Sequence, residues 1–527
     1  MMKYPIGIQS FAQLREDNYV YVDKTALIYQ LVSLGKIYFL SRPRRFGKSL
    51  LVSTLKNYFL GKRELFKGLA IESLETEWKE YPVFHIDFNG SNFTNPDALE
   101  DVLDGMIKGW EREYGRTPDY TDIGKRFAYV LQRAHERSGR RCVVLVDEYD
   151  KPILDVLDTG LMDDRRERLL EESSREALKG FYSVFKAADD DLQFVLLTGV
   201  TKFSQVSVFS GFNQPADISM DPRYEALCGI TQEELERCFS VPVREMAESE
   251  GVSFEEMMSR LKLQYDGYHF SRKLTDIYNP FSLLNAFASQ TIQDYWFRSG
   301  TPSYLIRLLA HTDENLDEIT GKYYDPQEFV DYKASVEKPL PMIYQSGYLT
   351  IKDYNREFGT FLLDYPNNEV KKGFVSLVAS DYLNPSQEMG SWIRNVVASL
   401  RKGEAEALCK LFTSFLADIP YTMRRKSDER ERERYFHYTF YLIFRLISVY
   451  TVCTEKVQSE GRVDCIVETA GYVYIFEFKL DGSADEALRQ IEEKGYGRPF
   501  ASDRRTLYKI GVSFSSRTGT VEEWKIG

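Results

Sequence analysis

The sequence of 527 residues is long enough for about three or four domains. Hydrophobic residues make up 43% and charged residues 28%, as in ordinary globular proteins. The 68 lysines and arginines and 80 aspartates and glutamates give a formal net charge of −12, which argues against a protein that coats nucleic acid non-specifically. A nuclease is not excluded, because it needs only a local basic surface and a metal ion.

Signals for export and for membrane insertion are missing from the sequence. The N-terminus has no basic segment followed by an apolar stretch, and no run of about 18 apolar residues occurs. None of the six cysteines forms a CxxC pair, which favours reduced thiols over disulfides or zinc. We therefore expect a cytoplasmic protein without a membrane span.

Strands and helices alternate over residues 1–220. Short apolar runs predict strands at 36–40, 81–88, 142–146 and 194–198. Periodic segments predict helices at 47–60, 97–115, 127–138 and 167–188. Such alternation predicts an α/β domain whose parallel sheet is covered by helices on both faces.

Two further domains are expected. Residues 221–372 read as a helical lid or winged-helix-like domain, with helices at 231–239 and 254–265 and one strand pair near Gly347. Residues 373–527 combine helices, a charge run at 424–434 that reads most simply as a solvated segment, and an apolar helix at 435–450. A strand hairpin at 464–468 and 473–480 and a helix at 484–494 follow, so we predict a second α/β domain.

A phosphate-binding loop is predicted between the first strand and the first helix. The stretch SRPRRFGKS at 41–49 ends in the Gly-Lys-Ser of a P-loop, where backbone N–H groups at a helix N-terminus hold phosphates. Lys48 would bind the β- and γ-phosphates and Ser49 would bind Mg²⁺. Arg42 stands where the first glycine is usual, so the loop must turn differently. The remaining predicted nucleotide contacts are Arg44, Arg45, Phe46 and Gly47.

A second motif strengthens this interpretation, since a lone Gly-Lys-Ser recurs by chance. The buried strand CVVLV ends in Asp147 and Glu148, which would hold the Mg²⁺ shell and polarise the attacking water. A solvated acidic turn is the simpler alternative. Thr198 could sense the γ-phosphate from another strand end or merely cap that strand. Asp87 ends a further strand near the site, and a simple strand cap is the alternative for it as well. We predict a P-loop NTPase sheet that binds ATP and Mg²⁺.

A carboxylate–lysine pattern near the C-terminus predicts a metal-dependent nuclease site. Asp464 precedes Glu477-Phe-Lys479 by one strand hairpin, and residues two apart on a strand share a face. Two carboxylates can bind Mg²⁺ that activates water, and Lys479 would offset developing negative charge. Gln490 on the next helix could orient water or phosphate. A plain surface hairpin is the alternative.

An upstream acid could complete this metal site. Glu433 is the predicted residue, although Glu429, Glu431 and Glu460 compete for the role. The five histidines show no metal-binding spacing, and no GxSxG elbow is present, so serine hydrolysis is set aside.

Seven parts of the sequence, spread over nearly its whole length, resemble the bacterial AAA-ATPase-like proteins that carry a C-terminal PD-(D/E)XK nuclease domain. They are YVDKT at 21–25, RPRRFGKS at 42–49, VDEYDKP at 146–152, LTGVTK at 197–202, YDGY at 265–268, YNPF at 278–281, and GRVD at 461–464 with FEFK at 476–479. In this family Arg also replaces the first P-loop glycine. The resemblance implies a signal-transduction ATPase and a restriction-endonuclease-like C-terminal fold, and it suggests the hypothesis of defence against phage or mobile DNA.

Three functions agree with these patterns. The first is an ATP-regulated, Mg²⁺-dependent nuclease that acts on nucleic acid, with DNA as the expected substrate. The second is a nucleotide-dependent switch or scaffold whose nuclease-like domain binds nucleic acid or protein without cleaving. The third is a defence protein that senses nucleotide and needs a partner or invader signal. The sequence leaves open whether ATP is hydrolysed and whether the chain forms a homo-oligomer.

Overall fold

The computed structural model describes residues 2–163, 166–202, 215–299, 304–305, 319–330, 339–383, 389–418, 443, 452–454, 457–458, 461–462, 464–515, 517–518 and 520–527. The chain divides into two compact units, Met1–Val370 and Lys371–Gly527. No helix in the described part combines the length and apolar character needed to cross a membrane.

The first unit is built on a five-stranded sheet in the order β2-β3-β6-β1-β7. Its strands are β1 (Ile37–Ser41), β2 (Val83–Asp87), β3 (Cys142–Asp147), β6 (Leu192–Gly199) and β7 (Ala216–Asp217). Every neighbouring pair runs parallel, which confirms the predicted sheet. All six residues of β3 are buried, as expected for a strand covered on both faces.

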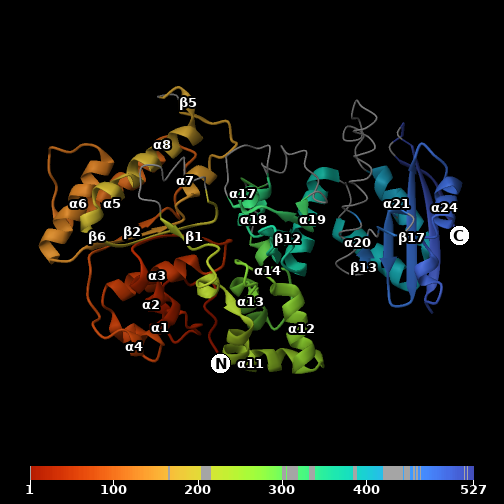
Figure 1. The fold of residues 1–527 in the computed structure, drawn as a ribbon, viewed down its shortest axis with the longest axis horizontal. Coiled ribbons are helices and arrows are strands. Elements are labelled where there is room, and N and C mark those ends of the chain that lie inside the picture. Colours follow the sequence, from red (N-terminus) through yellow and green to blue (C-terminus); the bar gives the residue numbers. More distant parts are fainter. Residues whose placement is uncertain are drawn as a thin grey trace. The chain divides into compact units, whose positions relative to one another are not determined.

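Helices cover both faces of this sheet (Figure 1). One layer holds α1 (Phe11–Glu16), α2 (Thr25–Leu34), α3 (Lys48–Phe59) and α4 (Ile71–Leu74), and the other holds α5 (Ala98–Tyr114), α6 (Ile123–Ser138) and α8 (Leu170–Tyr182). The helix expected at 167–188 is shorter and divided. Glu167 has a left-handed φ of 51°, so α8 starts only at Leu170, and a separate α9 (Val184–Ala187) follows.

The rest of the first unit is mainly helical. Its helices include α11 (Gln232–Glu250), α12 (Phe254–Tyr265), α13 (Pro280–Ser289), α14 (Tyr295–Arg298), α17 (Pro326–Phe329) and α18 (Leu340–Gln345). Helix α11 extends past the expected end at Phe239, because Pro242 opens a second helical stretch after a non-helical turn at Phe239.

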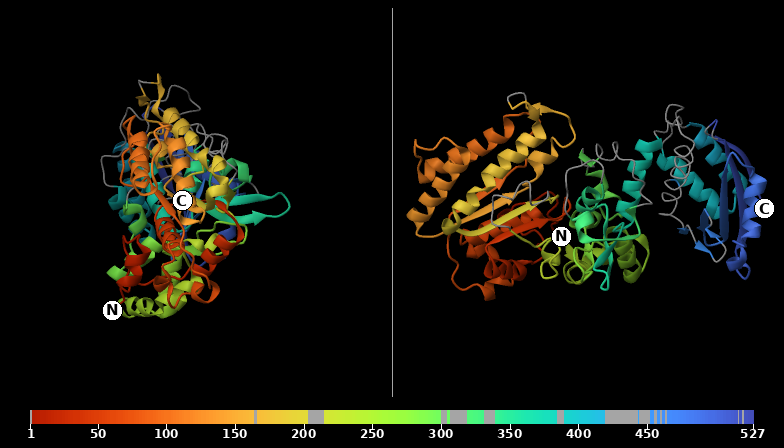
Figure 2. Two further views of the ribbon diagram at one scale, coloured as in Figure 1. Left: turned by 90° about the vertical axis from the view of Figure 1, so that its left-hand side faces the viewer. Right: turned by 45° about the horizontal axis from the view of Figure 1, so that its top comes forward.

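The strand pair expected near Gly347 belongs to a three-stranded antiparallel sheet. It consists of β10 (Lys322–Tyr324), β11 (Thr350–Asn355) and β12 (Thr360–Asp364) in the order β10-β12-β11. The β11–β12 hairpin projects from the first unit, as the left view of Figure 2 shows. Shorter elements are η1 (Arg63–Phe66), α7 (Lys151–Leu154), β4 (Met162–Asp163), β5 (Arg168–Leu169), η2 (Asp189–Asp191), η3 (Glu225–Leu227), β8 (Ile230–Thr231) and β9 (Ile277–Tyr278).

The second unit contains a mixed sheet in the order β13-β16-β17-β18-β19. The strands are β13 (Val452–Thr454), β16 (Cys465–Glu468), β17 (Tyr472–Leu480), β18 (Thr506–Ser515) and β19 (Thr520–Ile526), and only β17 and β18 run parallel. Helix α24 (Ala484–Glu493) packs on one face, and α20 (Met389–Lys402) and α21 (Ala405–Asp418) lie on the other (Figure 1). A small pair, β14 (Val457–Gln458) and β15 (Gly461–Arg462), precedes the predicted hairpin β16–β17, and α19 (Asn368–Leu383) joins the units.

Close packing of α24 on the sheet depends on Gly511 in β18. A Cβ atom at this position would lie 2.3 Å from the Ala484 carbonyl oxygen and 3.0 Å from the Leu488 nitrogen, which are backbone atoms that cannot move aside locally. Any side chain at 511 would therefore push α24 away from β17.

Replacing Gly511 should destabilise the second unit. We expect Gly511→Ala to cost about 1–3 kcal/mol, the usual range for forcing extra atoms into a packed interface. Gly471→Ala is the matched control, because its Cβ would meet nothing within 4 Å. Calorimetry of the two full-length variants should show a lowered transition for Gly511→Ala only. Equal melting of both variants would contradict the packing argument.

Candidate functional site

The carboxyl ends of four parallel strands meet at one edge of the first sheet. In the sheet register Ser41 pairs with Gly199 and Asp87 with Asp147, and Thr198 lies one residue before Gly199. The predicted phosphate loop, the acid that ends β3 and the threonine that ends β6 therefore share this edge, as they do in α/β sheets that bind ligands.

The loop between β1 and α3 presents a helix N-terminus to this edge. Gly47 has a left-handed φ of 92° and is the N-cap of α3, and no described side chain caps the helix there. Lys48 and Ser49 are the first helical residues, so their backbone N–H groups are free of helical acceptors. Arg45 also has a positive φ, of 68°, so the loop turns at a residue that is not glycine.

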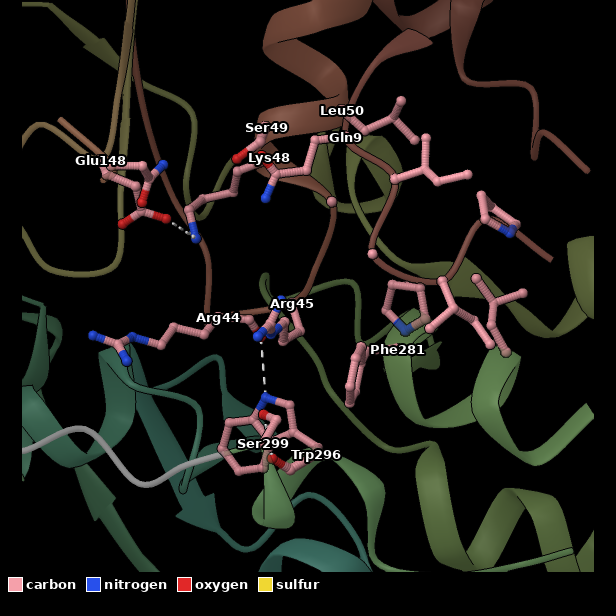
Figure 3. Close-up of a pocket in the computed structure, with 18 of the residues that line it drawn as sticks. Gln9, Arg44, Arg45, Lys48, Ser49, Leu50, Glu148, Phe281, Trp296 and Ser299 are labelled. Carbon is pink, nitrogen blue, oxygen red and sulfur yellow. Dashed lines mark hydrogen bonds and ion pairs between the residues drawn. The ribbon is translucent and has the colours of Figure 1, made fainter. Parts of the chain in front are cut away.

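Lys48 is held beneath the loop. Its side chain is 4% exposed, and Nζ donates to the carbonyl oxygens of Arg42 at 3.1 Å and Pro43 at 3.3 Å. Nζ also lies 3.5 Å from Oε1 of Glu148 (Figure 3). The lysine is thus fixed with its charge directed to the place where phosphates would bind.

Arg42 has a structural position within the loop. Its guanidinium donates to the carbonyl oxygens of Ser41, Ser219 and Tyr224, and it lies 4.1 Å from the ring centroid of Phe270. Burial lowers the pKa of Arg42. The arginine that replaces the usual glycine therefore points into the protein and anchors the loop.

The neighbouring predicted residues differ in where their side chains lie. Phe46 is buried against Tyr268, with ring centroids 4.7 Å apart, so it anchors the loop in the same way. Arg44 and Arg45 are exposed, and the Arg45 guanidinium lies 5.1 Å from the Phe281 ring centroid. Both arginines line the cavity above the loop (Figure 3).

Asp147 and Thr198 contact each other directly. Thr198 Oγ1 donates to Asp147 Oδ1 at 2.7 Å, and both residues are almost fully buried. The next acid, Glu148, has a left-handed φ of 53° and lines the cavity. The structure therefore brings together the predicted pair of acids and the threonine.

Sequence reasoning missed Asp150. This fully buried acid accepts hydrogen bonds from the Val200 and Thr201 backbone nitrogens and from Thr201 Oγ1, at 2.6 to 3.0 Å. Burial, and then the Glu148 charge, raise the pKa of Asp150 to about 6. These hydrogen bonds join the VDEYDKP and LTGVTK motifs at the site. Because the two motifs are far apart in the sequence, the sequence alone does not predict this contact.

A cavity of about 460 Å³ lies over the loop. Its walls include the loop with the end of β3, the N-terminal segment 5–9, helix α7, and the helices α13 and α14. Asn89, Ser346 and Tyr348 also line it. The lining residues that sequence reasoning missed include Ile6, Ile8, Gln9, Leu284, Asn285 and Trp296. Of the sequence motifs, only YNPF at 278–281 indicated the wall that α13 forms. Asn279 caps α13, and Pro280 and Phe281 line the cavity.

These residues fit a nucleotide with its Mg²⁺. A helix N-terminus, a lysine and two arginines match a polyphosphate, and Ser49 and Asp147 are oxygen ligands of the kind that Mg²⁺ prefers. Apolar side chains in the lining, such as Ile6 and Leu284, match the faces of a base.

The second unit brings four predicted residues into one cluster. Gln490 on α24 contacts Glu477 Oε1 through Nε2 and accepts from Lys479 Nζ through Oε1. Lys479 Nζ lies 3.7 Å from Glu477 Oε1. Asp464 Oδ2 accepts from the Phe478 nitrogen at 2.8 Å, which places the aspartate beside the same strand. The two strand residues share a face, as their spacing predicts.

Glu477 is a buried carboxylate within this cluster. It is 2% exposed, and Oε2 has no hydrogen-bond partner among the described residues. Burial, and then the Asp464 charge, raise the pKa of Glu477 to about 7. An orphaned buried carboxylate oxygen next to a second carboxylate fits a divalent metal, because a cation would offset both charges.

The upstream acid of this site is not established. Glu433 and the competing Glu429, Glu431 and Glu460 lie outside the described residues, as does most of the helix expected at 435–450. The described residues contain no group of three or more His, Cys, Asp or Glu side chains that could hold a metal.

Comparison with known proteins agrees with this geometry. Residues 5–209 match the family described as "Predicted AAA-ATPase", and residues 431–524 match the PD-(D/E)XK nuclease superfamily. The chain belongs to the AAA-ATPase-like proteins with a C-terminal PD-(D/E)XK nuclease domain. A relative from Azotobacter chroococcum mcd 1, "Uncharacterized protein in vnfD 5'region", is 36% identical over 524 residues, with 98% of each chain covered.

Metal binding at the nuclease domain should depend on pH through Glu477. Because the pKa of its carboxyl is raised to about 7, we expect the group to lose its proton, and so to become able to bind a metal, as the pH rises through that value. We expect Mn²⁺ affinity without nucleotide to be about tenfold weaker at pH 6 than at pH 8, since metal and proton compete for the same oxygens. Calorimetric titration of the full chain would measure this.

Two variants separate this effect from other pH effects. Glu477→Gln should bind Mn²⁺ weakly at both pH values, whereas Glu493→Gln, an exposed position on α24, should follow the wild type. If Glu477→Gln keeps the wild-type affinity and pH dependence, Glu477 is not the ligand.

Proposed function

We propose that this protein binds and hydrolyses ATP and uses nucleotide occupancy to regulate a Mg²⁺-dependent nuclease that acts on DNA. The observation that carries the nucleotide half is the shared sheet edge, where Lys48 and Ser49 at a helix N-terminus line a cavity of about 460 Å³ together with Glu148. Asp147, the residue before Glu148, lies buried at the same edge in a hydrogen bond with Thr198. The nuclease half rests on the cluster around Glu477.

The lining of the cavity favours a nucleoside triphosphate over a bare phosphate compound. It combines the phosphate-binding groups of the loop with apolar side chains from the segment 5–9 and from α13. Gln9 and Asn285 are carboxamides that can both donate to and accept from a base edge. We assign ATP as the nucleotide on this basis and on the family of the domain.

The residues around the loop suggest how hydrolysis would proceed. Lys48 Nζ lies 3.5 Å from Glu148 Oε1, so each group neutralises part of the other's charge. A γ-phosphate would compete for Lys48 and release Glu148 to accept a proton from water. Thr198 fixes Asp147 through its 2.7 Å hydrogen bond, which keeps that acid oriented towards the Mg²⁺ position. Mg²⁺, when bound, would neutralise charge that develops on the phosphates.

The cluster in the second unit suggests a phosphodiester hydrolase. Asp464 and Glu477 would hold Mg²⁺, which supplies water activation when bound. Gln490 holds Lys479 beside Glu477, so the ammonium lies where negative charge would develop on a phosphate. If this arrangement does not support cleavage, the domain would only bind nucleic acid or protein. The switch or scaffold is therefore the alternative function.

The distribution of charge favours nucleic acid as the partner of the second unit. Residues 371–527 contain 24 lysines and arginines against 22 acids, whereas residues 1–370 contain 44 against 58. The acidic character of the chain thus lies in the first unit. A role in defence against phage or mobile DNA remains a hypothesis that the family resemblance suggests.

Cleavage assays with point variants test both halves. With plasmid DNA and Mg²⁺ or Mn²⁺, we expect Asp464→Ala to lower cleavage at least about 100-fold, since one of two predicted metal ligands is lost. Lys48→Ala should weaken ATP binding at least about tenfold and abolish the effect of ATP on cleavage. Lys62→Ala, an exposed lysine just after α3, is the control and should behave like the wild type.

The outcomes separate the candidate functions. Loss of cleavage in Asp464→Ala together with an ATP effect that needs Lys48 supports the regulated nuclease. Intact DNA and RNA under every nucleotide and metal condition, with ATP still bound, would leave the switch or scaffold as the function.

A further inference from the structure

A buried acid connects the nucleotide cavity to the helix that leads out of the first unit. Glu369 lies in the first turn of α19 and is 1% exposed. Its carboxylate accepts a hydrogen bond from Ser282 Oγ at 2.7 Å and another from the Trp296 backbone nitrogen at 2.7 Å. Ser282 lies in the first turn of α13 and Trp296 in α14, so one carboxylate binds near the start of both helices.

These two helices form a wall of the cavity. Helix α13 contributes Phe281, Leu284 and Asn285, and α14 contributes Trp296. The Trp296 indole Nε1 donates to the Arg44 carbonyl oxygen at 3.1 Å, which ties the wall to the phosphate loop (Figure 3). A short path of hydrogen bonds therefore runs from the loop through Trp296 to Glu369.

Helix α19 is well placed to respond to this path. Asn367 Oδ1 accepts from the Val370 nitrogen at 3.1 Å, and Asn367 Nδ2 donates to the Asp266 carbonyl oxygen, so the start of the helix is fixed within the first unit. The helix continues without a break past Val370, where the first unit ends, to Leu383.

We propose that Glu369 is a positioning residue that couples nucleotide occupancy of the cavity to helix α19. A nucleotide in the cavity meets Arg44 and Trp296 and shifts the helices that Glu369 binds. If α19 did not follow, the hydrogen bonds of a buried carboxylate would break, and an unpaired buried acid is costly. This coupling rests on the proposed function, because the nucleotide site is itself a proposal.

Burial makes the Glu369 carboxylate depend on its hydrogen-bond partners. Burial raises the pKa of Glu369 to about 7, while the hydrogen bonds from Ser282 and Trp296 oppose that rise. The buried Glu369 carboxylate therefore depends on hydrogen bonds from α13 and α14 in place of those from water. A glutamine keeps its size but can accept at only one of the two oxygens, so it should loosen one of the two links.

Hydrogen exchange on the full chain tests the coupling without relying on cleavage. We expect a non-hydrolysable ATP analogue with Mg²⁺ to change amide exchange in residues 371–377 of the wild type at least about fivefold. Glu369→Gln and Ser282→Ala should bind the analogue with wild-type affinity within about threefold, since neither residue lines the cavity, and should lose most of that response. Glu357→Gln, at an exposed position on the β11–β12 hairpin, is the control.

The outcomes distinguish this inference from the proposed function. If the analogue binds and exchange in α19 does not change, or if Glu369→Gln responds like the wild type, the coupling is wrong. If the wild type binds no nucleotide, the coupling and the proposed function fall together. If α19 responds but DNA stays intact in every condition, the coupling stands and the nuclease proposal fails.

Discussion

The nucleotide site depends on how the loop between β1 and α3 is anchored from behind. An ordinary P-loop turns on glycines, whereas this loop is fixed by side chains that point into the protein. Arg42 donates to carbonyl oxygens of Ser219 and Tyr224, and Phe46 packs edge-on against Tyr268. Pro43 lies so close to Gly347 that a Cβ there would be 2.6 Å from the proline ring. Ser219, Tyr224, Tyr268 and Gly347, which are far from the loop in the sequence, therefore help to hold it in place.

This anchoring explains why charged groups are buried around the loop. Hydrogen bonds and a facing ring make a buried guanidinium less costly, and Arg42 donates through both terminal nitrogens and faces Phe270. The same rule applies to buried acids, which need hydrogen-bond donors around them. Asp150 and Glu369 accept hydrogen bonds that offset part of their desolvation, and both have raised pKa values. Each of these groups joins two segments that are far apart in the sequence. Burying their charge costs free energy of folding, but it also specifies which segments come into contact.

The parts that the sequence predicts are those governed by short-range rules. An apolar run that ends in Asp147 predicts a buried parallel strand, and alternation along β17 places Glu477 and Lys479 on one face. Residues that reach the site from a distance leave no such pattern. Ile8 and Trp296 line the cavity only because the chain folds back over the loop, and Asp150 binds Thr201 across 51 positions. Left-handed backbone at Glu167 is likewise set by its surroundings, so the start of α8 was misplaced.

The net charge of the whole chain is a poor guide to its partner. The value of −12 combines a first unit with a large acidic excess and a second unit with 24 basic residues against 22 acids. Charges in 0.15 M salt are screened beyond about 8 Å, so a phosphate backbone at Asp464 responds to the local groups rather than to the distant excess. Two carboxylates at a nucleic-acid site would repel that backbone unless a cation offsets them. Burial, and then the Asp464 charge, raise the pKa of Glu477, and a divalent metal bound there would offset both effects.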